Sequence, residues 1–470
     1  MVHYRRIIPR LDGEEIEDRF DYYLRLVKNG VAGFIIFGGE LETVRHVLKR
    51  LQYAAGHPLI IASDLEQGLG QQIRGGTIFP PAMAIASAIN SLGPDVRSSE
   101  LRNVYRAIAV EARYAGINAI LAPVVDINTN PENPIIATRA FGEDPETVSF
   151  FGCEMIRVLQ ENRIIACGKH FPGHGDTEVD SHIGLPLIRK DLSSLENLEL
   201  VPFKRAIDAG VGMIMLGHLS VPAIDPSGIP VSLSDKAVSY LRKRLGFKGM
   251  VLTDAMNMGA IGEYAENEAS LMALRAGADI ILHPADPDGV AAYLGQKGYK
   301  SGTLNLDHTS LTSLPSQEMP AFSEHKRLSE ELTKMAIRAD GEIEIKRPFL
   351  ILLNDEKKER GLCLIRVLQE RYPHIKHCTV LPGEDVPWHT IPAGHELIAG
   401  VFSEIKAWKG RTSLWLKRAI DGLKERARLF ISFGNPYVIG SIQGVPKIYA
   451  YWDSEAAEKA VAEGLLLRRP

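Results

Sequence analysis

The chain has 470 residues, of which 45% are hydrophobic and 24% are charged, and its formal net charge is -4 at pH 7. This length exceeds what one hydrophobic core normally supports, so we expect two domains. The slightly acidic balance argues against nucleic acid or an anionic membrane as a general partner, and the sequence has no apolar run long enough to cross a bilayer.

Short apolar runs alternate with amphipathic stretches from residue 31 to residue 284. Each run is apolar throughout, which is typical of strands in a parallel sheet covered on both faces. The seven runs span residues 31–37, 58–64, 117–126, 163–170, 211–218, 249–255 and 278–283. No eighth strand is evident. The alternation alone therefore fits either a (β/α)8 barrel with one unrecognised element or a doubly wound open sheet.

Polar residues stand where these runs cease to be apolar. They are Asp64, Asp126, Lys169 with His170, His218, Asp254 and His283. Polar groups that converge from the carboxyl ends of many strands are typical of the catalytic face of a barrel, whereas an open sheet would spread them along an edge. We therefore predict an α/β protein whose residues 1–300 form a TIM-like (β/α)8 catalytic barrel.

A second α/β series follows a segment that lacks this pattern. Residues 301–347 are predicted to form a helical connector, and residues 348–470 a smaller αβα sandwich domain. The runs FLILLND, HCTVLP, ELIAGVFSEI, RLFISFGNP and KIYAYWD predict its strands. A domain of about 120 residues has a normal size. Because no cluster of ionisable residues stands out within it, we expect a supporting role.

The segment KHFPGHGDTEVDSHIGLP, residues 169–186, is rich in titratable groups on a loop with several glycines and prolines. Its imidazoles and carboxylates are His170, His174, His182, Asp176 and Asp180. Such clusters on a loop behind a buried strand are typical of catalytic sites. The spacing Asp180-Ser-His182 lets the carboxylate reach the imidazole and fix its tautomer, as general acid/base catalysis requires. A surface loop with fortuitous charges is the alternative.

Asp254 lies just beyond the buried run that ends in VLTDAM. If positive donors surround this carboxylate, it is ionised and can act as a nucleophile or an electrostatic stabiliser. The alternative is that it only caps the following helix. Asp64 and Arg139 complete the polar set, because a carboxylate can hold vicinal hydroxyls and a guanidinium can bind a carbonyl or a hydroxyl. Glu66, Asp126, His218 and His283 are interpreted as supporting or packing groups.

The same loop could instead hold a divalent metal, since imidazole and carboxylate suit zinc, manganese or iron. Against this alternative, its residues are irregularly spaced and lack the rigid His-x-x-x-His frame of a helix. No glycine loop that could cradle a phosphate follows a strand. The four cysteines form no Cys-x-x-Cys pair, so we expect reduced, buried thiols. We predict neither a metal nor another cofactor.

The motifs KHFPGHGDT and DSH, followed further along the chain by LTDAM, resemble those of the β-N-acetylglucosaminidases of glycoside hydrolase family three. The segments SDLEQG, NPIIATRAFGEDP and ELVPF also match that family in kind and order. The resemblance covers residues 1–340. More loosely, the tail from residue 348 resembles the αβα sandwich that many members carry after the barrel.

This resemblance implies a retaining exo-β-N-acetylglucosaminidase that removes terminal β-linked N-acetylglucosamine, with cell-wall fragments as the expected source. It implies that Asp254 attacks the anomeric carbon, while His182, assisted by Asp180, protonates the leaving oxygen and later deprotonates water. Most glycosidases use a second carboxylic acid for that task, and the DSH motif marks the branch that uses a histidine on a mobile loop. The positions expected to bind the sugar are Asp64, Arg139, Lys169 and His170.

One segment departs from the family pattern. The chain reads DLEQGLGQQIR where members commonly read DxEGGRVxR, so that Gln72 stands in place of an arginine that helps to bind sugar. Arg74 could compensate if the loop is shifted.

Two further hypotheses remain open. A phosphorylase acting on N-acetylglucosaminides or β-glucosides is the main alternative, because an imidazole acid/base repels phosphate less than a carboxylate does. A sugar-sensing protein on a decayed barrel is disfavoured, since Asp254, Asp180 and His182 are all present. The expected partner is a small carbohydrate or muropeptide, with no nucleic acid or membrane and no prediction of oligomeric state. Because the chain begins without an apolar signal-peptide core, we expect a cytoplasmic protein, although a cleaved leader would leave the same start.

Overall fold

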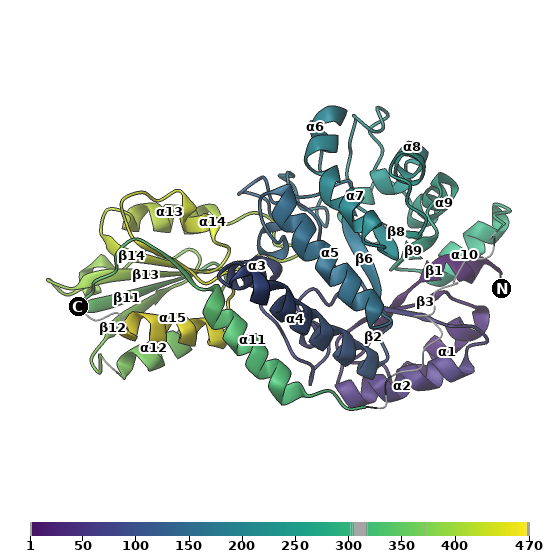
Figure 1. The fold of residues 1–470 in the computed structure, drawn as a ribbon. Coiled ribbons are helices and arrows are strands. Elements are labelled where there is room, and N and C mark those ends of the chain that lie inside the picture. Colours follow the sequence, from purple (N-terminus) through teal and green to yellow (C-terminus); the bar gives the residue numbers. More distant parts are fainter. Residues whose placement is uncertain are drawn as a thin grey trace. The chain divides into compact units, whose positions relative to one another are not determined.

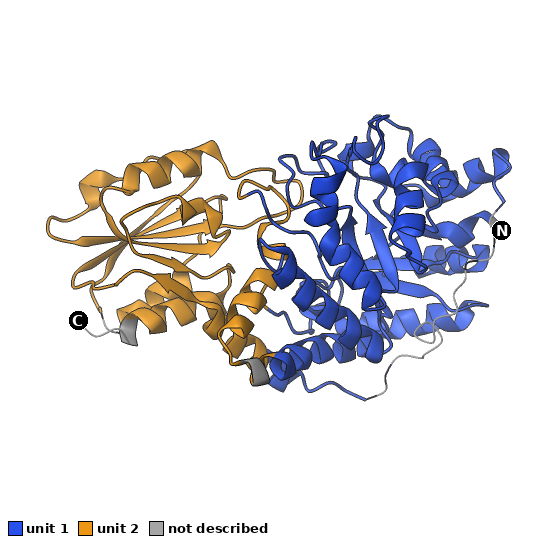
Figure 2. Ribbon diagram, turned by 45° about the horizontal axis from the view of Figure 1, so that its top comes forward, with its two compact units in different colours: residues 1–79, 98–130, 140–326 blue, residues 80–97, 131–139, 327–470 orange. Residues whose placement is uncertain are grey.

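The structure is a computed structural model that describes residues 2–300, 302, 304, 316, 318–370 and 372–467 (Figure 1). It divides the chain into two compact units (Figure 2). The first comprises Met1–Phe79, Ser98–Asn130 and Ala140–Lys326, and the second comprises Pro80–Arg97, Pro131–Arg139 and Arg327–Pro470. Residues 305–315, within the predicted connector, lie outside the described residues. The predicted domain boundaries stay a prediction.

The described strands of the first unit form one parallel sheet, in the order β1-β9-β8-β7-β6-β5-β4-β3-β2. They are β1 (Ile7–Ile8), β2 (Arg10–Asp12), β3 (Gly33–Phe37), β4 (Ile60–Ser63), β5 (Ala119–Ile120), β6 (Ile165–Phe171), β7 (Met213–Leu216), β8 (Met250–Ala255) and β9 (Ile280–Leu282). Each of the seven predicted runs overlaps one of the strands from β3 to β9, and only β6 extends beyond its run, by Phe171. The predicted TIM-like fold is confirmed.

The eighth position of the barrel belongs to an N-terminal strand that the sequence analysis did not find. β1 pairs in parallel with β9, and β2 pairs in parallel with β3, so the two pieces close the barrel. Pro9 separates them and has no N–H to donate, but its carbonyl accepts a hydrogen bond from Ile35 at 3.0 Å. Two pieces of two and three residues around a proline are too short to produce a recognisable apolar run.

Alternate residues of the strands fill the interior of the barrel. Ile60 and Ala62 of β4, like Met213 and Met215 of β7, belong to one buried apolar cluster to which strands on every side of the barrel contribute. The two-residue spacing follows from the pleat, which points successive side chains to opposite faces. The barrel is thus a packed core, and a ligand site must lie at its ends.

Helices surround this sheet (Figure 1). They include α1 (Phe20–Asn29), α2 (Leu41–Ala54), α4 (Pro94–Ala115), α5 (Pro145–Glu161), α6 (Leu192–Asn197), α7 (Leu200–Asp208), α8 (Asp235–Ser239), α9 (Glu266–Ala276) and α10 (Pro287–Gln296). The start of α5 shows how the sequence sets a boundary: Asp144 accepts a hydrogen bond from the backbone N–H of Thr147 at 2.8 Å, and Pro145 occupies the first turn. Gly277, with φ +108°, ends α9 in the left-handed conformation that favours glycine.

The second unit contains a mixed sheet with the order β10-β15-β14-β13-β11-β12. Its strands are β10 (Arg338–Asp340), β11 (Pro348–Asn354), β12 (Lys376–Val380), β13 (Glu396–Ser403), β14 (Ala427–Gly434) and β15 (Lys447–Tyr449), and only the β10–β15 pairing among them is antiparallel. Its helices are α3 (Ala82–Asn90), α11 (Phe322–Ala336), α12 (Leu362–Gln369), α13 (Leu414–Leu423), α14 (Tyr437–Gly440) and α15 (Glu455–Leu467), α11 beginning in the first unit.

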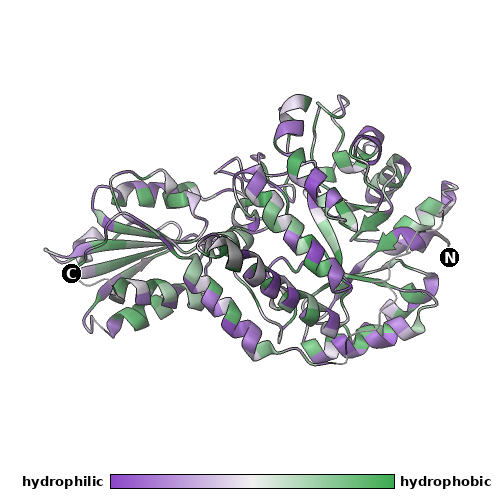
Figure 3. Cartoon of the chain, in the orientation of Figure 1, coloured by the Kyte–Doolittle hydropathy of each residue, from purple (hydrophilic) through white to green (hydrophobic). Residues whose placement is uncertain are grey.

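Two separate apolar clusters place the helices on opposite faces of this second sheet. α12 and α15 pack on one face, and α13 and α14 on the other. The predicted αβα sandwich is confirmed. In Figure 3 the central strands β11, β13 and β14 are mostly green, while the helices carry both green and purple residues, as expected when helices cover a buried sheet.

The cysteines and the helix lengths add two observations. All four thiols are free; Cys153, Cys167 and Cys363 are buried, but Cys378 is partly exposed, which corrects the expectation for that residue. Within the described part of the chain, none of the helices combines the length and the apolar character needed to cross a bilayer.

Candidate active site

Lys169 lies near the carboxyl end of β6 and holds two acids that follow β4. Its ammonium nitrogen is 2.7 Å from Asp64 Oδ1 and 2.7 Å from Glu66 Oε1, and its side chain is only 2% exposed. Asp64, at 27% exposure, keeps an accessible carboxylate that can accept hydrogen bonds from a ligand. The structure therefore brings together two predicted sugar-binding residues, and it assigns Glu66 a supporting contact.

His170 follows Lys169 through a cis peptide bond and is oriented by Asp126, which lies after β5. His170 Nδ1 is 2.8 Å from Asp126 Oδ2, and the backbone N–H of His174 donates to Asp126 Oδ1 at 2.7 Å. Burial by itself would raise the pKa of Asp126, but the imidazole of His170 and these hydrogen bonds lower it overall. The ionised carboxylate therefore fixes the His170 ring. Asp126 supports the site rather than simply packing beneath it.

The predicted acid/base pair is formed within one turn of the loop after β6. Asp180 Oδ1 accepts a hydrogen bond from the backbone N–H of His182 at 2.9 Å and lies 2.8 Å from His182 Nδ1. The Asp180 side chain is fully buried, while that of His182 is 23% exposed. Because Nδ1–H donates to the carboxylate, the proton that His182 exchanges with a ligand is the one on Nε2.

The tip of this loop is attached to the segment that follows β8. The backbone N–H of Gly259 donates to the His182 carbonyl at 3.0 Å, and that of Ala260 donates to the Ser181 carbonyl at 3.1 Å. A Cβ at position 259 would lie 2.6 Å from the His182 carbonyl oxygen, so this attachment requires glycine. The attachment carries His182 to the end of the barrel at which Asp254 lies.

Asp254 is the second-last residue of β8, and its Oδ1 accepts a hydrogen bond from the backbone N–H of Ala255 at 2.8 Å. Burial would raise its pKa, but the imidazole of His170 and the backbone N–H of Ala255 contribute to an overall lowering. The carboxylate is thus ionised at neutral pH, as a nucleophile must be. The helix-cap alternative is wrong, because the residue before α9 is Ala265 and no side chain caps that helix.

His218, which follows β7, supports the strand end that carries Asp254. Its Nε2 lies 3.0 Å from the carbonyl oxygen of Ala255 and therefore donates, while its Nδ1 lies 2.6 Å from Ser232 Oγ and accepts. Burial lowers its pKa, which agrees with a neutral ring. The only sequence signal for this role was its position at the end of an apolar run.

His174 and Asp176 shape the loop. Burial lowers the pKa of His174 to about 4, and its Nδ1 and Nε2 lie 2.7 Å and 3.0 Å from the hydroxyls of Thr177 and Ser181. Asp176 accepts a hydrogen bond from Thr129 at 3.0 Å. Over the described residues, no three His, Cys, Asp or Glu side chains are arranged to hold a metal ion.

Two arginines remain to be considered as sugar-binding residues. Arg139 ends the short helix η3 (Ala137–Arg139) in the second unit and donates to the Ile135 carbonyl at 3.0 Å, so its role in sugar binding stays a prediction. Arg74 forms ion pairs with Glu14, at 2.7 Å, and with Glu40. The suggestion that Arg74 replaces the arginine missing at Gln72 is therefore not supported, because these carboxylates hold its guanidinium.

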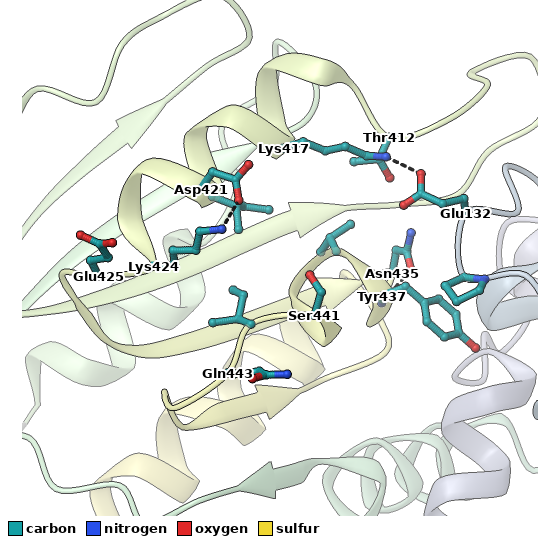
Figure 4. Close-up of a pocket in the computed structure, with 14 residues that line it drawn as sticks. Glu132, Thr412, Lys417, Asp421, Lys424, Glu425, Asn435, Tyr437, Ser441 and Gln443 are labelled. Carbon is teal, nitrogen blue, oxygen red and sulfur yellow. Dashed lines mark hydrogen bonds and ion pairs between the residues drawn. The ribbon is translucent and has the colours of Figure 1, made fainter.

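A cavity of about 530 Å³ lies within the second unit and contains none of the predicted catalytic residues (Figure 4). Lys417 and Asp421 of α13, and Lys424 directly after it, line one side of the cavity. Lys417 pairs with Glu132, and Lys424 pairs with Asp421 at 2.8 Å. These lysines are thus neutralised by neighbouring acids, and we assign this cavity no chemistry.

The fold and the site together define a TIM-like barrel enzyme, since such barrels place their chemistry at the carboxyl ends of the strands. Residues 15–309 match the glycosyl hydrolase family 3 N-terminal domain. The chain therefore belongs to glycosyl hydrolase family 3.

Similar proteins bear hexosaminidase names. The chain is 32% identical over 312 residues to the beta-hexosaminidase A of Pseudoalteromonas piscicida, which covers 60% of this chain but only 52% of that protein. It is 29% identical over 320 residues to a beta-hexosaminidase of Nitrosomonas eutropha, covering 65% and 90% of the two chains. A solved glycoside hydrolase family 3 beta-N-acetylglucosaminidase from Paenibacillus sp. str. FPU-7 has a TM-score of 0.78 and 26% identity, and covers 98% of this chain and 95% of that one.

Proposed function

We propose that the protein is a retaining exo-β-N-acetylglucosaminidase that releases terminal β-linked N-acetylglucosamine. The observation that carries this proposal is the arrangement of an ionised Asp254 and the His182–Asp180 pair at one end of the barrel. The names of the hexosaminidase relatives and of the structural neighbour support the choice of sugar.

In the first step, Asp254 attacks the anomeric carbon while the bond from that carbon to the leaving oxygen breaks. The proton on His182 Nε2 passes to the leaving oxygen, and Asp180 keeps the ring oriented through Nδ1. A glycosyl-enzyme results. In the second step, Nε2 takes a proton from water, the water oxygen bonds to the anomeric carbon, and the Asp254 carboxylate leaves.

The residues around Lys169 would bind the sugar in both steps. Asp64, with its accessible carboxylate beside the Lys169 ammonium, suits vicinal hydroxyls. His170, held by Asp126, and Arg139 complete the predicted binding set. The ion pairs of Lys169 and the contact of His170 with Asp126 fix these side chains before a ligand arrives, so less orientational freedom is lost on binding.

We further propose that the natural substrates are peptidoglycan fragments, including muropeptides. The test compares purified enzyme on an aryl N-acetyl-β-glucosaminide and on the matched aryl β-glucoside, each with and without phosphate. We expect faster turnover of the N-acetylated substrate, the β-anomer of N-acetylglucosamine as the first product seen by NMR, and no effect of phosphate. Initial formation of the α-anomer would contradict retention, and sugar 1-phosphate would identify the phosphorylase instead.

A further inference from the structure

Both ends of the loop that carries His182 converge on one ammonium group. The loop leaves β6 near Gly173, passes Asp176 and returns at Lys190. Lys190 Nζ lies 3.3 Å from Asp176 Oδ2 on the outgoing end and forms a shorter contact with Glu199 Oε1. Glu199 directly precedes α7. A single side chain thus joins the outgoing end, the returning end and the start of a barrel helix.

The Glu199 carboxylate depends on this lysine. Its side chain is 1% exposed, and among the described residues its Oε2 has no hydrogen-bond partner. A buried carboxylate without a countercharge is strongly unfavourable. Removing Lys190 would therefore leave the Glu199 carboxylate without a countercharge. It would also remove the ion pair that holds Asp176 at the base of the loop.

Glu199 also packs on the point at which the loop departs. Gly173 has φ +130°, and a Cβ there would lie 2.9 Å from the Cβ of Glu199. A movement of Glu199 would therefore change the packing at Gly173, where the loop leaves β6. Asp176 is fixed further by the hydroxyl of Thr129 at 3.0 Å, so the base of the loop has contacts on two sides.

We propose that Lys190 is a positioning residue that keeps the base of this loop closed and thereby keeps His182 beside Asp254. At the tip, backbone hydrogen bonds join Ser181 and His182 to the segment after β8. Ordering a loop costs conformational entropy, and a tie at the base lowers that cost for contacts at the tip. The catalytic consequence rests on the proposed function. Lys190 itself touches no reacting atom.

The kinetic test is Lys190→Met with two substrates that differ only in the leaving group: phenyl and 2,4-dinitrophenyl N-acetyl-β-glucosaminide. In Lys190→Met, kcat/KM for the phenyl substrate should fall roughly 10- to 100-fold, because the general acid is no longer well positioned and part of the usual acid/base contribution is lost. The dinitrophenyl substrate needs little protonation and should change by less than about threefold. Lys190→Arg should restore most of the phenyl activity.

The matched control is Lys236→Met. Lys236 lies on α8 in the same unit, is 57% exposed, and pairs with Asp225 at 3.0 Å, whereas the partners of Lys190 are Asp176 and Glu199. The Lys236→Met substitution should leave kcat/KM for both substrates unchanged. An equal loss on both substrates in Lys190→Met would overturn the proposal, because a general structural defect does not distinguish leaving groups.

Hydrogen exchange provides a second measurement that needs no activity. Peptides covering residues 177–189 should exchange faster in Lys190→Met than in the wild type or Lys190→Arg, with the barrel strands unchanged. Unaltered exchange in these peptides would overturn the proposal for Lys190, whatever the activity of the wild type. If the wild type hydrolyses no N-acetylglucosaminide, the proposed function fails, and the exchange measurement still tests the role of Lys190. Should Lys190→Met not fold, Asp176→Asn, which retains the Lys190–Glu199 pair, should give a smaller change in the same direction, and no change would again overturn it.

Discussion

In both units, charged residues follow the ends of parallel strands, but the partners of these residues differ between the units. In the barrel, imidazoles face carboxylates beside the ion pairs of Lys169, as His170 faces Asp126 and His182 faces Asp180. In the second unit, the groups after β11 and β13 form ion pairs of lysine or arginine with acids. These pairs include Lys409–Asp355, Lys406–Glu356 and Arg360–Glu356.

This difference shows why a parallel sheet alone does not make an active site. Lysine and arginine stay charged throughout the neutral range, so their pairs with acids maintain structure. An imidazole changes charge between pH 5 and 8 and can transfer a proton. The predictions below test whether the two units differ as this chemistry requires.

The largest expected difference is between Asp254→Asn in the barrel and Asp355→Asn in the second unit. The first should lower kcat on the aryl N-acetyl-β-glucosaminide roughly 10⁴-fold without unfolding the protein, because the covalent step is lost. The second should leave kcat unchanged but lower the unfolding free energy by about 1–3 kcal/mol, since hydrogen bonds to Lys409 and Ser413 are weakened. Kinetics and urea denaturation measure both. A similar loss of kcat in the two variants would refute the contrast.

Lys169→Met tests how much the buried ion pair of the barrel contributes to stability. The substitution leaves Asp64 and Glu66 without their shared countercharge, so the unfolding free energy should fall by about 3–5 kcal/mol. Lys409→Met, at a site that is 20% exposed, should cost less. Urea denaturation of both variants provides the comparison. Equal costs would mean that burial does not distinguish the two sites.

His182→Ala tests whether the imidazole of the barrel transfers protons. Its kcat/KM for a phenyl leaving group should fall on the order of 10²- to 10³-fold, whereas an activated dinitrophenyl leaving group should be much less affected. His46→Ala, at an exposed site on α2, is the control and should match the wild type. If His182→Ala were equally inactive on both substrates, leaving-group protonation would not be its role.

The smallest expected effect is a pH dependence of opposite sign in the two units. The pKa of His174 is lowered to about 4 by burial, so between pH 4 and 6.5 the unfolded chain binds a proton that the folded barrel does not. The stability of the barrel should therefore decrease as the pH falls from 6.5, by roughly 1.4 kcal/mol per pH unit for one group. His174→Gln should reduce this slope in hydrogen exchange of barrel peptides.

Asp453 should act in the opposite direction. Burial, with the nearby acids Glu404 and Glu458, raises its pKa to about 7 despite Arg360, so between pH 3.8 and 7 the folded state binds the extra proton. Stability of the second unit should therefore decrease as the pH rises through this range, and Asp453→Asn should remove that contribution. Tryptophan fluorescence reports this unit, because all four tryptophans lie in Arg327–Pro470. The contributions to the pH dependence of stability that His174→Gln and Asp453→Asn remove should have opposite signs. Contributions of the same sign would contradict the comparison of the two units.

Much of the fold could be predicted because a buried parallel strand is apolar throughout, and each of the runs from 31–37 to 278–283 overlaps a strand. The N-terminal strand escaped because Pro9 divides it into pieces without a run of their own. The sequence likewise placed Asp254 at a strand end. It could not show that Asp126 and Glu66 hold His170 and Lys169, because these contacts depend on which strands become neighbours in the barrel.

The sequence by itself determined the alternation of strands and helices, the polar strand ends and the adjacent Asp180 and His182, because all of these are local patterns. Only the tertiary structure decided barrel closure through β1 and β2, the attachment of the His182 loop to Gly259 and the joining of Asp176 and Glu199 by Lys190. Each of these contacts joins different elements of the fold. Their geometry is set by packing of the barrel, which no short stretch of sequence encodes.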